Sequence, residues 1–266
     1  MTADTEQATH PGGSTPKPPV VLKLGGSVIT EKGAPETVDE EGLAAAAEAI
    51  GTADVERLVI VHGGGSFGHP AAEAAGASID SGTNDVRAIR EIHDAMGRLH
   101  GTVLDSLQSE GVRAVPVRPL SAGYRMDSGA VHLQTDQLSA MLAEGFVPVL
   151  HGDVFTTEGA GATIVSGDEL VVSIGRDLDA EAIGLCTTVS GVLSSSGAVI
   201  PEITDFEAVS DVLGGSDATD VTGGMAGKVR ALLELEATAQ IFDLEGLAAF
   251  LAGEAPGTRI DGRNRQ

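Results

Sequence analysis

Three glycine-rich segments, each beside a lysine or a histidine, contain the residues of this sequence best suited to chemistry. They are Gly25-Gly26-Ser27, Gly63-Gly64-Gly65-Ser66, and Gly223-Gly224 with Gly227. Glycine lets the main chain approach an anion closely, and N–H groups at a turn or a helix start bind phosphate oxygens. The first predicted strand is not followed by a Gly-x-Gly-x-x-Gly dinucleotide fingerprint, and no Gly-x-x-x-x-Gly-Lys-Ser/Thr loop is present. We therefore expect a phosphate site of another type.

Lysine is scarce, which makes each lysine informative. Sixteen side chains are cationic, and only four of them are lysines, namely Lys17, Lys23, Lys32 and Lys228. Phosphoryl transfer needs positioning and positive charge on the moving group and on the leaving oxygen. Three of the lysines lie in or near glycine-rich segments, so we interpret them as phosphate-binding and catalytic groups. Ordinary surface roles are the alternative.

Two histidines flank the second glycine segment. His62 lies at the end of a predicted strand, where a hydrogen-bonded bystander and a ligand are both open interpretations. His69 precedes Pro70, and proline suits the first turn of a helix. We therefore expect the ring of His69 near a helix N-terminus, with a phosphate-binding or proton-donating role.

Predicted strands and helices alternate along the chain. The strands cover 20–24, 58–61, 112–117, 146–150, 182–187 and 239–242, and 154–155 forms a hairpin with 163–165. Helices are predicted over 38–50, 85–110, 136–144, 168–178 and 225–237, followed by a closing helix. This alternation predicts an α/β fold, a three-layer αβα sandwich with a mainly parallel central sheet and ligands at the carboxyl ends of its strands. Residues 1–19 are predicted to be a disordered tail, and 20–266 a single domain.

The composition excludes several classes of function. The 266 residues carry a formal charge of −23, which argues against a general nucleic-acid binder and against binding to anionic membranes. A hydrophobic content of 42% is sufficient for a folded core. The single cysteine, Cys186, cannot form an internal disulfide, and no apolar run approaches the ~18 residues of a membrane span, so we expect a cytoplasmic protein. Acidic excess with scarce lysine indicates work in concentrated salt, with an ordinary acidic enzyme as the alternative.

The motifs, in order, resemble those of the isopentenyl phosphate kinases, a branch of the amino acid kinase superfamily. The resemblance runs from about Val20 to Ile260. It is carried by Lys23-Leu24-Gly25-Gly26-Ser27, Ile29-Thr30-Glu31-Lys32, the His62–Pro70 segment, His151-Gly152-Asp153, Ser166-Gly167-Asp168, and the run from Asp220 to Lys228. The lysine-glycine start is shared across the superfamily. The Ser66-Phe67-Gly68-His69-Pro70 segment is narrower, because its histidine marks members whose acceptor is itself a phosphate or phosphonate.

The resemblance implies a specific activity and site. The family transfers the γ-phosphoryl group of ATP to isopentenyl phosphate, forming isopentenyl diphosphate for isoprenoid synthesis by the alternative mevalonate pathway, as a homodimer with Mg²⁺. An acceptor-phosphate half of about 20–165 and a nucleotide half of about 166–260 are implied, and no residue is assigned as a metal ligand. The implied ATP-binding residues are Lys23, Gly25, Gly26, Ser27, Gly65, Thr188, Gly224 and Lys228; the acceptor-binding residues are Gly64, His69 and Gly152; and the catalytic residues are Lys23, Lys32, His69, Asp168 and Lys228.

One segment departs from the family pattern. Members usually carry Asp-Val-Asp-Gly after the fifth strand, where this sequence reads Thr188-Val189-Ser190-Gly191. Two carboxylates are therefore replaced on the nucleotide side, where the hydroxyl of Thr188 can still contact the nucleotide.

Three alternative functions stay open on the sequence. The nearest is a kinase with the same His69 signature that phosphorylates a phosphonate such as fosfomycin. A non-catalytic ligand sensor on the same fold would be expected to have lost the lysines, which are all present. Acetylglutamate or uridylate kinase activity does not need His69.

Overall fold

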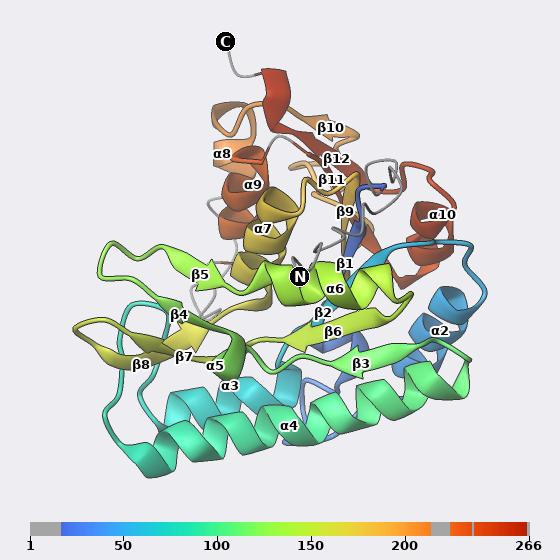
Figure 1. The fold of residues 1–266 in the computed structure, drawn as a ribbon. Coiled ribbons are helices and arrows are strands. Elements are labelled where there is room, and N and C mark those ends of the chain that lie inside the picture. The colour runs from blue at the N-terminus through green and yellow to red at the C-terminus, as the bar shows by residue number, and fades with distance from the viewer. Residues whose placement is uncertain (1–16, 214–223, 236, 265–266) are drawn as a thin grey trace, which may run out of the picture.

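The computed structural model describes residues 17–213, 224–235 and 237–264, and its centre is an eight-stranded sheet (Figure 1). The predicted tail up to residue 16 and the turn residues Thr222 and Gly223 lie outside these ranges. The strand order is β10-β12-β11-β9-β1-β2-β6-β3. In chain order these strands are β1 (Val20–Leu24), β2 (Leu58–His62), β3 (Ala114–Pro116), β6 (Val147–His151), β9 (Ala182–Thr187), β10 (Glu202–Ile203), β11 (Thr238–Asp243) and β12 (Thr258–Asp261).

The sheet is mainly parallel, as the alternation of strands and helices predicts. Strands β11, β9, β1, β2, β6 and β3 pair in parallel, while β12 runs antiparallel to β11. The central strands are buried on both faces, which explains why their sequences are continuous aliphatic runs rather than alternating ones. Such strands must be covered by helices on each side.

Two groups of helices cover the two faces. On one face α2 (Glu40–Gly51), α4 (Val86–Ser109) and α10 (Leu247–Leu251) pack against alternate residues of β1 such as Leu22 and Leu24. On the other face α6 (Thr135–Ala143), α7 (Gly167–Asp177) and α9 (Gly224–Leu233) pack around Val21, Val59 and Val61. Figure 1 shows α4 running along one side of the molecule with α7 and α9 on the opposite side of the sheet. The three-layer αβα prediction is confirmed.

A second sheet of four strands stands beside the main one. Its order is β5-β4-β7-β8, formed by β4 (Gly123–Arg125), β5 (Val131–Leu133), β7 (Asp153–Thr157) and β8 (Gly161–Val165). The predicted hairpin of 154–155 with 163–165 is confirmed as the antiparallel pair β7–β8. Strands β4 and β5 are not predicted, because each has only three residues and shows no clear alternation.

Several short elements also differ from the sequence-based expectations. Helices α1 (Gly26–Ile29), α5 (Pro119–Ala122) and α8 (Ser210–Leu213) are not predicted, and neither is β12, which follows the closing helix α10 and lies between β10 and β11 in the sheet. Helix α3 (Gly65–Ala74) begins four residues before His69. No helix in the described ranges has the length and apolarity to cross a membrane.

The long helices begin at capping side chains. Asp39 accepts a hydrogen bond from the Gly42 N–H before α2, and Asp85 accepts one from the Arg87 N–H before α4. Ser166 and Glu169 form a reciprocal capping box at the start of α7. This box fixes the helix start that presents Asp168.

Candidate active site

The carboxyl ends of the central parallel strands open into one cavity of about 850 Å³. This is the edge of the sheet where the fold class predicts a ligand. Apart from Gly224, every residue that the sequence assigns to the site lines this cavity: Lys23, Gly25, Gly26, Ser27, Lys32, Gly64, Gly65, His69, Gly152, Asp168, Thr188 and Lys228. Gly224 is the first residue of α9, beside the lining residue Met225.

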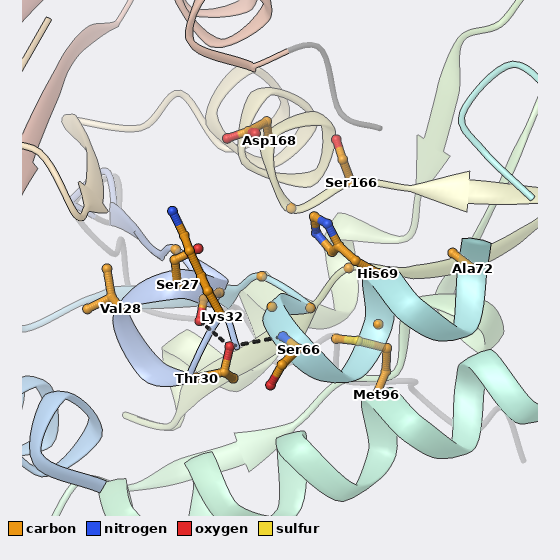
Figure 2. Close-up of a pocket in the computed structure, with 18 of the residues that line it drawn as sticks. Ser27, Val28, Thr30, Lys32, Ser66, His69, Ala72, Met96, Ser166 and Asp168 are labelled. Atoms are coloured by element: carbon orange, nitrogen blue, oxygen red, sulfur yellow. Dashed lines mark hydrogen bonds between the residues drawn. The ribbon is translucent and has the colours of Figure 1, made fainter. Parts of the chain in front are cut away.

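The first two glycine segments lie backbone against backbone. A Cβ atom at Gly26 would overlap the main chain of Gly65, and Gly65 itself has a φ of 47°. Thr30 joins the segments, because its Oγ1 donates to the Gly26 carbonyl at 2.8 Å and accepts from the Ser66 N–H at 3.0 Å (Figure 2). The segments therefore place the starts of two helices, α1 and α3, on one wall of the cavity.

Asp168 brings two of the rare lysines together. The Lys23 Nζ donates to Asp168 Oδ1 at 2.6 Å, and the Lys228 Nζ lies 3.5 Å from Asp168 Oδ2. Burial alone would raise the pKa of Asp168, but the two ammonium groups outweigh it and hold that pKa below its ordinary value. The carboxylate is therefore ionised, and the trio carries a net positive charge that suits a polyphosphate.

Lys32 and His69 complete the polar part of the cavity. Lys32 is exposed just after the first glycine segment, and His69 is exposed on α3. Figure 2 shows the Lys32 side chain and the His69 ring extending toward the side of the cavity that carries Asp168. Lys32 and His69 are distant in the sequence, but both reach the cavity because the strands that precede them, β1 and β2, are neighbours in the sheet.

The prediction that Pro70 lies in the first turn of a helix is wrong. Helix α3 begins at Gly65, so His69 lies in the second turn and Pro70 is inside the helix. The glycines permit this early start, since Gly65 can adopt its positive φ without a Cβ penalty. Pro70 has no N–H to donate to the Ser66 carbonyl, which instead accepts from the Glu36 N–H at 3.0 Å.

An apolar wall beyond His69 is a feature that the sequence analysis missed. It is formed by Ala72, Ile92, Met96, Ile164 and Val165, all of which line the cavity. A Cβ at Gly68 would lie 2.6 Å from the Met96 sulfur, so the glycine allows α3 and α4 to approach. Ile92 and Met96 follow the same helical spacing as the core residues of α4, and that spacing does not distinguish a cavity wall from a core.

Two partly buried polar networks beside the cavity were also missed. His93 Nδ1 lies 2.9 Å from Asp153 Oδ2, and this hydrogen bond raises the pKa of His93 above its ordinary value. Arg125 pairs with Glu169 of the α7 capping box at 2.7 Å. Both networks connect the small sheet to the helices around the cavity.

The structure offers no dedicated metal cage in the described ranges, because they contain no group of three or more histidine, cysteine or acidic side chains arranged to hold a metal ion. Mg²⁺ usually binds through one or two carboxylates together with substrate phosphates and water. The residues present fit an ion that enters on a nucleotide.

Comparison with known proteins decides the family. Residues 18–241 match the amino acid kinase family. The isopentenyl phosphate kinase of Haloferax volcanii is 61% identical over 91% of this chain and 98% of its own length. That of Methanothermobacter thermautotrophicus is 35% identical over 92% of this chain and 100% of its own length. The chain belongs to the isopentenyl phosphate kinase family. A solved isopentenyl phosphate kinase structure superposes with a TM-score of 0.78 and 30% identity, covering 90% of this chain and 98% of that one.

Membership of the isopentenyl phosphate kinase family makes the chain a kinase with the amino acid kinase fold, as the sequence predicts. The segment that departs from the family pattern, Thr188-Val189-Ser190-Gly191, directly follows β9. Thr188 and Val189 line the cavity after β9. Thr187 holds the turn, since its Oγ1 donates to the Val189 carbonyl at 3.0 Å and accepts from the Val189 N–H at 3.2 Å.

Proposed function

We propose that the protein transfers the γ-phosphoryl group of ATP to isopentenyl phosphate, forming isopentenyl diphosphate for isoprenoid synthesis. The observation that carries this proposal is that one cavity is lined by the Lys23–Asp168–Lys228 trio, by Lys32, and by His69 with the apolar wall. The three lysines suit a polyphosphate, and His69 beside an apolar wall suits a phosphate with a hydrocarbon tail.

ATP lies at the lysines in this proposal. The N–H groups of Gly26 and Ser27 lie at the start of α1, where they have no intrahelical acceptor, and they hold phosphate oxygens. Gly25 precedes them, Gly65 contacts the nucleotide from α3, and Lys23 and Lys228 supply positive charge. Gly224 and Thr188 border the nucleotide on the α9 and β9 sides. The nucleotide phosphates and water, rather than a protein cage, would hold Mg²⁺, which would supply charge neutralisation there.

The acceptor phosphate binds at His69. His69 donates a hydrogen bond to it, and the main chain of Gly64 and Gly152 lines the same position. The five-carbon tail lies against Ile92, Met96 and Ile164, where it leaves water. A small phosphonate would leave this wall uncovered, which is why we favour a prenyl phosphate over the fosfomycin type of acceptor.

The transfer itself needs charge rather than a base. An oxygen of the acceptor phosphate is already anionic near pH 7, so it attacks the γ-phosphorus without losing a proton. The bond between the γ-phosphorus and the β–γ bridging oxygen breaks, and ADP leaves with that electron pair. Lys32 stabilises the charge on the moving phosphoryl group, and Asp168 keeps Lys23 and Lys228 in position.

Three further properties belong to the proposal. The acceptor half spans about 20–165 and the nucleotide half about 166–260. The resemblance to the family supports a cytoplasmic homodimer. The charge of −23 supports work in concentrated salt, because salt screens the self-repulsion of so many carboxylates.

A panel of acceptors tests the proposed function. Purified protein in molar KCl with MgATP is offered isopentenyl phosphate, dimethylallyl phosphate, fosfomycin and UMP in parallel, and ADP release is measured. We expect fast turnover of isopentenyl phosphate, similar or slower turnover of dimethylallyl phosphate and none of UMP. A higher kcat/KM for fosfomycin would replace the proposal with the phosphonate kinase, and no turnover of any acceptor would favour a ligand sensor.

A further inference from the structure

Three histidines form a buried group beneath the second glycine segment, outside the cavity. His62 and His151 are paired residues at the ends of the adjacent strands β2 and β6, and His100 reaches them from α4. Their relative exposures are 0%, 0% and 1% in that order. The ring centroids lie 5.3 Å (His62–His100), 5.5 Å (His62–His151) and 4.7 Å (His100–His151) apart. We call these three residues the histidine cluster.

Hydrogen bonds set the tautomer of each ring. His62 Nδ1 lies 3.1 Å from the Gly63 carbonyl, which can only accept, so Nδ1 carries the proton. Burial lowers the pKa of His62 to about 4, so its ring is neutral and its Nε2 is an acceptor. That Nε2 lies 3.1 Å from His100 Nδ1, which therefore donates. The chain of donors runs from His100 to His62 to the Gly63 carbonyl.

The same pattern occurs on the neighbouring strand. His151 Nδ1 donates to the Gly152 carbonyl at 2.9 Å. The two strand ends are also joined directly, because the Gly152 N–H donates to the His62 carbonyl at 3.1 Å. Each ring thus holds the carbonyl of the glycine that follows it, and Gly63 and Gly152 both line the cavity.

A held carbonyl fixes the direction of the next N–H. In a trans peptide, the C=O of one residue and the N–H of the next point to opposite sides. With the Gly63 carbonyl turned toward the His62 ring, the Gly64 N–H faces away from the histidine cluster, and Gly64 lines the cavity. Gly64 is also the N-cap residue of α3, where N–H groups suit an anion.

We propose that His100 is a positioning residue for the acceptor phosphate: its Nδ1–H donates to His62 Nε2 and, together with the Gly63 carbonyl, keeps His62 in one tautomer and ring position, and His62 in turn holds the Gly63–Gly64 peptide with its N–H turned into the cavity. This inference rests on the proposed function, in which Gly64 binds the acceptor. His100 and His62 do not line the cavity. They act through the peptide, not on the substrate.

If the histidine cluster only filled space in the core, it would stabilise the protein less than aliphatic side chains would. In the described part of the chain, the Nε2 atoms of His100 and His151 are buried without a hydrogen-bond partner. Leaving buried polar atoms unpaired destabilises a protein, and aliphatic side chains of similar volume would avoid that cost. Local rules are broken in this way mainly where function requires it.

The test uses three substitutions of His100 that separate its two ring nitrogens. His100→Phe keeps a ring and removes the donor, and we expect the KM for isopentenyl phosphate to rise roughly ten-fold with the KM for ATP unchanged. His100→Asn should restore the KM, because its Nδ2 stands where His Nδ1 stands. His100→Gln places its donor at the Nε2 position and should not restore it. Val103→Ala, one turn further along α4 and fully buried, is the control that lowers stability without changing either KM.

A spectroscopic measurement keeps the test independent of turnover. Long-range ¹H–¹⁵N correlation spectra of the wild-type protein should show His62 protonated at Nδ1, and His100→Phe should make that tautomer mixed. Protonation of His62 at Nε2 in the wild type, or equal rescue by Asn and Gln, would overturn the inference. An unchanged KM in His100→Phe would do the same. If the wild type does not turn over isopentenyl phosphate at all, the proposed function fails instead, while the tautomer result still stands.

Discussion

At the scale of single residues, Asp168 holds the ammonium groups of Lys23 and Lys228 close together. Its carboxylate lies within 3.5 Å of two ammonium groups in a partly closed site, so it offsets part of their repulsion. Lys32 is placed differently, because it is exposed on the rim of the same cavity. The three lysines of the cavity therefore divide into a pair held by Asp168 and a separate, exposed one; in the proposed reaction the pair receives the polyphosphate and Lys32 follows the moving group.

This division predicts the behaviour of Lys32. If Lys32 contacts the phosphoryl group mainly during transfer, Lys32→Ala should lower kcat by ~10²–10³-fold and leave both KM values nearly unchanged. Lys32→Arg should restore little, because a planar guanidinium does not replace a compact ammonium. Steady-state kinetics in molar salt provides the measurement.

Lys17 is the matched control for Lys32. It has the same charge and forms a surface pair with Glu181 at 3.4 Å, a type of contact that contributes little. Lys17→Ala should leave all kinetic parameters unchanged. A Lys32→Ala variant that keeps most of its kcat would show that Lys32 is an ordinary surface residue.

Residue types explain which part of the site could be predicted. The lysines and the glycine segments are recognisable in the sequence because lysine is rare and the glycines are clustered. Lys23, Lys32, Lys228 and the first two glycine segments all line the cavity. Ile92, Met96 and His100 do not stand out, because they occupy the same face of α4 as ordinary core residues such as Leu99. Only the packing of α4 against α3 and β6 distinguishes a cavity wall and a buried hydrogen-bond donor from core.

At the scale of elements, helix starts position the chemistry. Helix α7 presents Asp168 at its second residue, directly after the capping box of Ser166 and Glu169. Helix α3 presents His69 in its second turn, a position that the Pro70 signal misplaces because glycines allow the helix to begin earlier. Long helices were predicted closely from their periodicity, whereas short ones such as α1 and α5 depend on contacts that a local pattern does not contain.

The α7 start predicts a difference between two capping substitutions. Ser166→Ala and Asp39→Ala each remove a side-chain cap, so each should lower the free energy of unfolding by about 1 kcal/mol. Only Ser166→Ala should also lower kcat several-fold, because α7 carries Asp168 and α2 carries no residue of the site. Urea unfolding together with kinetics makes the comparison. Equal kcat values in the two variants would mean that the α7 start does not control the position of Asp168.

At the scale of the whole molecule, the order of the parallel strands is what makes one site from distant segments. The strands that precede the glycine segments, β1 and β2, are central neighbours, and β6 and β9 flank them. The alternation of strands and helices predicts such a sheet, since parallel strands need helical crossovers. The small sheet was predicted only as its hairpin, because the pairing of β4 with β5 and β7 joins segments too short to show a pattern.

The histidine cluster predicts how stability depends on pH. Burial lowers the pKa values of His62, His100 and His151 to about 4, 3 and 3, against 6.5 in an unfolded chain. Between these values the unfolded state binds more protons than the folded state, so stability falls as pH drops from about 6.5 toward 4, by at most ~1.4 kcal/mol per pH unit for each ring. The pKa of His93 is raised, so its contribution to stability is complete at low pH and is lost only as the pH rises above about 6.5.

Urea midpoints at pH 5, 6 and 7 in constant salt check this prediction. The midpoint should rise with pH, and His100→Asn should reduce the slope because one titrating ring is gone. Val103→Ala removes no titrating group and should lower the midpoints without changing the slope. Equal midpoints of the wild type at pH 5 and pH 7 would contradict the prediction.

The proposed function requires one cavity that holds ATP at its lysines and a phosphate acceptor at His69. The most direct test is the kinetics of His69→Ala with isopentenyl phosphate and MgATP in molar KCl, beside His132→Ala as the exposed control. A charge-assisted hydrogen bond contributes about 1.5–3 kcal/mol, so the KM for isopentenyl phosphate should rise by about ten- to a hundred-fold while the KM for ATP stays unchanged. A rise in the KM for ATP with an unchanged KM for isopentenyl phosphate would contradict the account.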